Sequence, residues 1–119
     1  MHNFKELKVW QEAMQIAKDV FITTRNFPAE EKFGLVSQIN RCAVSIPSNI
    51  AEGAGRGTDK EFNQFLNIAL GSSFELETQV LLAKEFNYIT NEQTIVLTEK
   101  VTKVQKMLNG LKKSVLQTS

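Results

Sequence analysis

The stretch LTEKVTKVQKMLNGLKKSV at residues 97–115 carries the clearest fold signal in the chain. Its apolar residues alternate steps of four and three, the spacing that places side chains on one face of an α-helix. The members of this face are Leu97, Val101, Val104, Leu108, Leu111 and Val115. Gly110 destabilises a helix by about 1 kcal/mol relative to alanine, yet the period continues across it. The stretch predicts a long amphipathic helix whose apolar face needs neighbours.

Three earlier segments repeat this helical spacing, whereas alternating apolar–polar stretches are nearly absent. The first segment follows a cap at Asn3 and Glu6 and has the apolar stripe Leu7, Trp10, Met14, Ala17, Phe21 and Thr24. The second covers about residues 29–53 and has the stripe Val36, Ile39, Ala43, Ile46 and Ile50. The third has the stripe Phe62, Phe65, Ala69, Ser72, Leu76, Val80 and Ala83.

Caps and prolines set the expected helix boundaries. Thr58 with Glu61 and Thr90 with Gln93 have the spacing of capping boxes, in which two side chains satisfy free backbone N–H groups. Pro28 predicts that the second helix starts at about residue 29, because proline suits a first helical turn. Pro47 predicts a kink or a local break inside that helix. We therefore expect an all-α fold in one domain over residues 1–119, an up-down-up-down antiparallel four-helix bundle.

Composition excludes several classes of protein. Hydrophobic residues make up 42% and charged residues 23% of 119 residues, which argues against wholesale disorder. A formal net charge of +1 does not require a polyanionic partner. No apolar run approaches the roughly 18 residues of a membrane span, so we expect a cytoplasmic protein without a membrane partner.

Residues for catalysis and for metal or cofactor binding are scarce. His2 is the sole histidine, at a terminus that we expect to fray, and Cys42 is the sole cysteine. We expect Cys42 to be a small buried hydrophobe, and we predict no enzyme activity, no metal and no cofactor. The run GAGRG at residues 53–57 lacks both phosphate-loop patterns and is typical of a helix end. The alternative is an anion bound at the amides before the third helix, near Arg56.

A polar stripe follows the second helix. At 100° per residue, five polar side chains fall within about 80° of one another: Arg41, Ser45, Asn49, Glu52 and Arg56. One interpretation pairs this stripe with other helices of the same chain, Glu75 or Glu77 being the candidates for Arg41. In the other interpretation, the stripe faces a neighbouring subunit or a nucleic acid.

Lysines gather on the last helix, opposite its apolar face. Lys103, Lys106 and Lys113 belong to residues 91–119, where five lysines against two glutamates give +3. Residues 58–90 carry two lysines against five acids, which gives −3. A lysine face is commonly just solvated, and the alternative is a weak surface for RNA or DNA to which Arg56 also contributes.

Several runs resemble one family. They are QINR at 38–41, SIPSNIAEG at 45–53 with Gly55 and Arg56, Gly71 with Ser72, ELE at 75–77 and FKELKVW at 4–10. They look like the bacterial four-helix-bundle proteins first noticed as reading frames within intervening sequences of 23S ribosomal RNA genes and often labelled ribosomal proteins. The resemblance implies an all-helical protomer, a homopentamer and no known catalysis. It also implies kinship to the accessory proteins of diversity-generating retroelements, which bind nucleic acid.

Two functional hypotheses follow. The first is a non-enzymatic oligomeric scaffold or binding module, with weak, electrostatic and poorly sequence-specific binding of RNA or DNA. The alternative is an assembly subunit whose partner is another protein and which makes no nucleic-acid contact.

Overall fold

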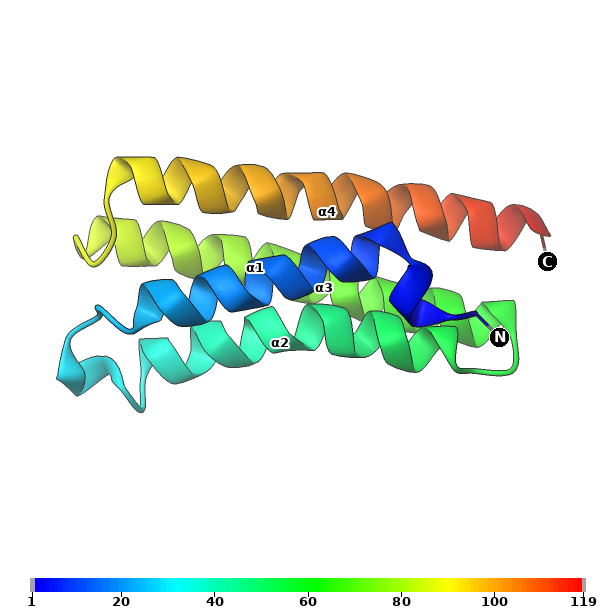
Figure 1. The fold of residues 1–119 in the computed structure, drawn as a ribbon, viewed down its shortest axis with the longest axis horizontal. Coiled ribbons are helices and arrows are strands. Elements are labelled where there is room, and N and C mark those ends of the chain that lie inside the picture. The colour runs from blue at the N-terminus through cyan, green and yellow to red at the C-terminus, as the bar shows by residue number, and fades with distance from the viewer. Residues whose placement is uncertain (1, 119) are drawn as a thin grey trace.

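The computed structural model describes residues 2–118, and this part of the chain forms four long α-helices and no strand. The helices are α1 (Lys8–Thr24), α2 (Leu35–Ala54), α3 (Asp59–Glu85) and α4 (Asn91–Thr118). Two short 3₁₀-helices, η1 (Phe4–Glu6) and η2 (Ala29–Glu31), precede α1 and α2. All four long helices lie along the longest dimension of a body of 46 × 24 × 20 Å (Figure 1). The prediction of an all-α fold with four helices is confirmed.

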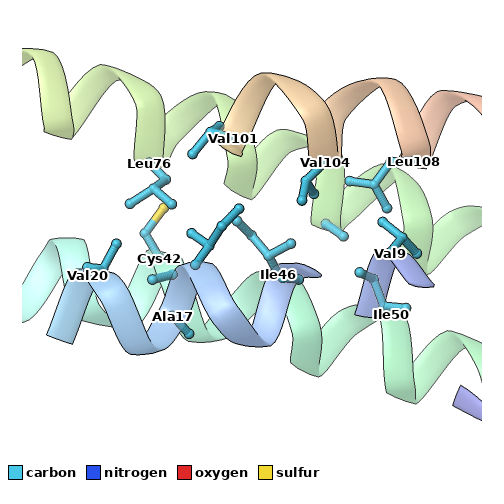
Figure 2. Close-up of a cluster of buried hydrophobic side chains, with 14 of the residues drawn as sticks. Val9, Ala17, Val20, Cys42, Ile46, Ile50, Leu76, Val101, Val104 and Leu108 are labelled. Atoms are coloured by element: carbon cyan, nitrogen blue, oxygen red, sulfur yellow. The ribbon is translucent and has the colours of Figure 1, made fainter. Parts of the chain in front are cut away.

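Each helix packs against its neighbours in the sequence, and α1 also packs against α4. Within residues 2–118, no Cα atoms closer than 8 Å join α1 to α3 or α2 to α4. Four helices therefore surround one shared core, in which Figure 2 shows Val9, Ile46, Ile50, Val104 and Leu108. The α1–α2 connection and the α2–α3 connection lie at opposite ends of the body (Figure 1).

Two of the three predicted helix caps are confirmed. The Thr90 hydroxyl accepts a hydrogen bond from the Gln93 amide at 3.0 Å, and the Gln93 side chain accepts one from the Thr90 amide at 2.9 Å. At α3, the Thr58 hydroxyl accepts from the Glu61 amide at 3.1 Å and donates to the Glu61 carboxylate at 3.0 Å. Asn3 caps η1 rather than α1, because its side chain accepts from the Lys5 amide.

The predicted start of the second helix is wrong. Residues 29–31 form η2, and α2 begins only at Leu35, after Gly34. Glu31 is used twice in this connection: its carboxylate accepts from the Leu35 amide at 3.4 Å and from the Tyr88 hydroxyl at 2.8 Å. These bonds tie the turn to the α3–α4 connection instead of extending the helix. Further along, α2 is uninterrupted across Pro47, so the chain has no break there.

The apolar stripe predicted for the first helix is correct only in part. The core face of α1 consists of Val9, Ala13, Ile16, Ala17, Val20 and Thr24. Met14 and Phe21 are 39% and 43% exposed and lie outside the core, whereas Leu7 and Trp10 are half-buried and pack against it. Two apolar stripes run side by side on α1 with the same helical spacing, so periodicity alone does not choose between them.

The other three stripes are mostly confirmed. Ile39, Ala43, Ile46 and Ile50 of α2 are buried, and so are all members of the α4 face except the half-buried Leu111. In α3 the stripe is correct at Phe62, Ala69, Leu76, Val80 and Ala83, and it lacks the buried residues Leu66, Ser73 and Gln79.

The tightest contact between helices occurs at Gly53. A Cβ atom at this position would lie 2.6 Å from the Cβ of Phe65 and 3.0 Å from a ring carbon of Phe62. Real Cβ atoms do not approach so closely, and the backbones of α2 and α3 set this distance. Glycine is therefore required here by the space between the helices.

We predict that Gly53→Ala lowers the free energy of unfolding by about 1–3 kcal/mol, because overpacking between two rigid helices outweighs the better helix propensity of alanine. Gly110→Ala is the matched control, since a Cβ there meets nothing within 4 Å. The control should raise the same free energy by up to about 1 kcal/mol. Urea denaturation measures both values, and a Gly53→Ala protein as stable as the parent would contradict the packing argument.

Candidate binding surfaces

The predicted polar stripe of α2 divides into a half-buried part and an exposed part. Ser45 and Asn49 belong to the half-buried part, at the contact with α3. The Ser45 hydroxyl lies 2.9 Å from the Ser72 hydroxyl of α3. The Asn49 side chain donates to the Ser45 carbonyl at 2.8 Å and to the Ser45 hydroxyl at 2.9 Å. These bonds satisfy polar groups between two helices, so Ser45 and Asn49 are structural residues.

Glu52 and Arg56 form an ion pair at the end of α2. The two side chains are exposed and lie 3.1 Å apart, and the Arg56 guanidinium lies 4.8 Å from the centre of the Phe65 ring. An exposed pair of this kind stabilises a protein by less than about 1 kcal/mol. Gly55, Arg56 and Gly57 form the turn that follows, which confirms the helix-end interpretation of the glycine-rich run.

Arg41 does not pair as predicted. Glu75 accepts a hydrogen bond from Gln79 at 3.3 Å, and Glu77 accepts one from Gln105 of α4 at 2.9 Å. The Arg41 side chain is exposed, and within residues 2–118 it has no hydrogen bond and no ion pair. The interpretation that pairs it with an acid of the same chain is therefore wrong. A neighbouring subunit or a nucleic acid stays the predicted partner of Arg41.

Cys42 is a buried residue of the α2–α3 contact, as predicted. It is 5% exposed, and its thiol donates to the Ser72 carbonyl at 3.1 Å. Burial and the carboxylate of Glu75 raise the pKa of the thiol to about 12. Because the thiolate is the reactive form of cysteine, a thiol with this pKa is a poor nucleophile at neutral pH.

His2 does not fray. Its amide donates to the Ala54 carbonyl at 2.8 Å, and its ring lies 4.8 Å from the Phe62 ring, centre to centre. This position at the end of α2 is twelve residues along the helix from Cys42, or about 18 Å, so the two cannot act together. Within residues 2–118, no group of three or more His, Cys, Asp or Glu residues could hold a metal ion. No helix in the same range is long and apolar enough to cross a membrane.

The predicted lysine surface is only partly free. Lys103 of α4 lies 3.2 Å from the Glu12 carboxylate of α1, which offsets its charge. Lys106 and Lys113 are exposed and have no ion pair among the described residues. The structure thus leaves two of the three predicted lysines available to a polyanion.

An apolar groove between α1 and α2 is the feature that sequence reasoning missed. It has a volume of about 660 Å³, and its lining includes Trp10, Met14 and Phe21 of α1 together with Val44 of α2. The signal was present in the sequence, because the stripe first assigned to the core of α1 is the one that lines this groove.

The model of the 23S rRNA-intervening sequence protein family matches residues 5–110. The chain belongs to this family. It is also similar to a protein of unknown function from the S23 ribosomal protein family of Bacteroides thetaiotaomicron, with 28% sequence identity and a TM-score of 0.80. That similarity covers 88% of this chain and 95% of the other, and no curated protein matches.

The raised pKa of Cys42 predicts a pH dependence of stability. The unfolded thiol ionises near its ordinary pKa of 9.0, whereas the folded thiol stays protonated up to about 12. The folded state therefore binds more protons between these values, and the stabilisation present below pH 9 is lost as the pH rises. Between pH 7 and pH 10, the free energy of unfolding should fall less for Cys42→Ala than for the parent. The difference between the two losses should be about 1–1.5 kcal/mol, measured by urea unfolding at each pH. Identical pH profiles for the two proteins would contradict the burial of a protonated thiol.

Proposed function

We propose that this member of the family is a non-enzymatic scaffold that assembles with copies of itself. The observation that carries the proposal is the amount of apolar side chain outside the core. Among the described residues, the exposed large hydrophobic ones are Met14, Phe21, Ile22, Phe33, Val44, Ile68, Phe74, Leu81, Leu82, Phe86, Ile95, Val96 and Leu116. Monomeric soluble proteins rarely expose large contiguous apolar patches, and larger patches mark interaction sites.

The proposed subunit is an up-down-up-down antiparallel bundle, and the proposed assembly is a homopentamer. The first part is supported by the positions of the helix connections at alternating ends of the body (Figure 1). The number of subunits is supported by the family resemblance. A scaffold role is supported by the chemistry of the chain, since its one thiol is buried with a raised pKa and its one histidine packs on Phe62.

Light scattering at micromolar concentration tests the assembly. We predict a mass several times the 13.4 kDa of one chain, with five copies expected. The same mass should persist at high salt, because burial of apolar side chains rather than ion pairing supplies the association. A mass of 13.4 kDa at these concentrations would contradict the proposal.

A second candidate function is weak binding of RNA or DNA. It is supported by Lys106 and Lys113, two exposed cations on a segment of net charge +3 over residues 91–119. Contacts between lysines and phosphates carry no sequence information, and their number sets the salt dependence. A symmetric assembly multiplies these few contacts, so an oligomer can bind where one subunit does not. The name of the family makes RNA the first nucleic acid to test.

The triple variant Lys103→Glu, Lys106→Glu, Lys113→Glu should abolish retention of RNA and of DNA at about 50 mM salt. The control variant changes Lys5, Lys8 and Lys60, which are also exposed, to glutamate. Both variants lower the net charge from +1 by the same six units, so only the position of the charge differs. Gel-shift assays measure retention, and light scattering checks that each variant keeps the mass of the parent.

Equal binding by parent and triple variant would show that this lysine face is not the contact. If the parent itself binds neither nucleic acid at 50 mM salt, the alternative takes its place, an assembly subunit with a protein partner.

A further inference from the structure

The α1–α2 groove and the outer face of α3 have matching chemistry. We propose that the groove of one copy receives the outer face of α3 from the next copy. This inference rests on the proposed self-assembly and names the two surfaces that carry it.

The groove is lined mainly by apolar side chains and by two cations. Met14 and Phe21 of α1 and Val44 of α2 line it together with Lys18 and Arg25. Within residues 2–118, the side chains of Lys18 and Arg25 have no hydrogen bond and no ion pair. The groove therefore has two free positive charges beside an uncovered apolar surface.

The outer face of α3 is the complement. Ile68, Phe74 and Leu82 are 51%, 52% and 44% exposed, although α3 already buries a full apolar stripe in the core. The same face carries the exposed carboxylate of Glu85, which has no ion pair among the described residues. A helix that is apolar on two sides needs cover on both.

The two surfaces also have similar lengths, and the outer face of α3 is accessible to another helix. Trp10 to Arg25 spans about 22 Å of helix and Ile68 to Leu82 about 21 Å, at 1.5 Å per residue. On α3, Gly71 lies between Ile68 and Leu82, and a Cβ atom at Gly71 would meet nothing within 4 Å. The lack of a side chain there lets another helix approach the backbone of α3 closely.

Other exposed apolar residues fit the groove less well. Ile95 and Val96 lie on α4, and Val96 lines a second groove that also contains Asp19 and Lys100. Asp19 and Lys100 are already paired with each other at 2.6 Å, whereas Glu92 of the same groove is exposed and has no ion pair among the described residues. Because this part of α4 is itself hollowed, it fits into another groove less well than the outer face of α3 does.

The arrangement is head to tail. The groove lies between α1 and α2, whereas the outer face of α3 belongs to a helix that α1 does not contact. Each copy can use both surfaces at once with two different neighbours. A contact between two different surfaces builds a closed ring or an open filament rather than a two-fold dimer.

Two double variants test the proposal. Phe21→Glu with Val44→Glu blocks the groove, and Phe74→Glu with Leu82→Glu blocks the outer face of α3. All four side chains are exposed, so helix content by circular dichroism should match that of the parent. Ile95→Glu, also at an exposed apolar position, is the control and should keep the parent mass.

Each double variant alone should have a mass of 13.4 kDa in light scattering. An equimolar mixture should give a 1:1 dimer of twice that mass, because one variant keeps an intact groove and the other an intact α3 face. In a further variant, charge reversal at Lys18 and Arg25 should weaken assembly, and reversal at Glu85 in the same chain should restore part of it.

The possible outcomes distinguish a failure of the proposed interface from a failure of the proposed self-assembly. A monomeric parent overturns the proposed self-assembly and this interface with it. An oligomeric parent whose two double variants keep its mass overturns the interface alone. Dissociation of only one variant, or a mixture that stays monomeric, also overturns it, because the groove then has an occupant other than α3.

Discussion

Between α2 and α3 there is no room for a side chain at Gly53, where a Cβ would lie 2.6 Å from that of Phe65. The same contact joins Ser45 to Ser72 through their hydroxyls and Cys42 to the Ser72 carbonyl. Small residues allow the two backbones to approach, and the hydrogen bonds satisfy the polar atoms that this approach buries. Because α1 and α4 each pack against one of these two helices, the position of the whole core depends on this contact.

This packing gives a structural role to one of the runs that resemble the family. The run SIPSNIAEG at residues 45–53 supplies the α3-facing side of α2 and its apolar stripe in the same nine residues. Ser45 and Asn49 are bonded within the helix pair, and the Cys42 thiol is held protonated by burial and by Glu75. Side chains of this kind stabilise the contact between the two helices, and the functions proposed above therefore rest on the outer surfaces.

Those outer surfaces combine exposed apolar side chains with charged ones. α1 buries one apolar stripe and leaves another in the α1–α2 groove, and α3 likewise exposes Ile68, Phe74 and Leu82 opposite its core face. Charges around them are uncompensated within the subunit, positive beside the groove and negative on α3. An assembly that covers both faces removes apolar surface from water and pairs those charges in one step. Any nucleic-acid binding would then use the lysines of α4, on a different part of the subunit.

Local patterns determined the number of helices, the caps at Thr58 and Thr90, and the apolar face of α4, because each depends on residues within a few positions of one another. Family membership also followed from contiguous runs such as residues 45–53. Only the tertiary structure decided which of two equally spaced stripes of α1 enters the core, since that choice depends on how α2 and α4 lie against it. It also decided that Arg41 is unpaired in this subunit while Lys103 is bonded to Glu12, a residue ninety-one positions away. Pairing across such a separation depends on how the helices pack, which helical periodicity does not encode.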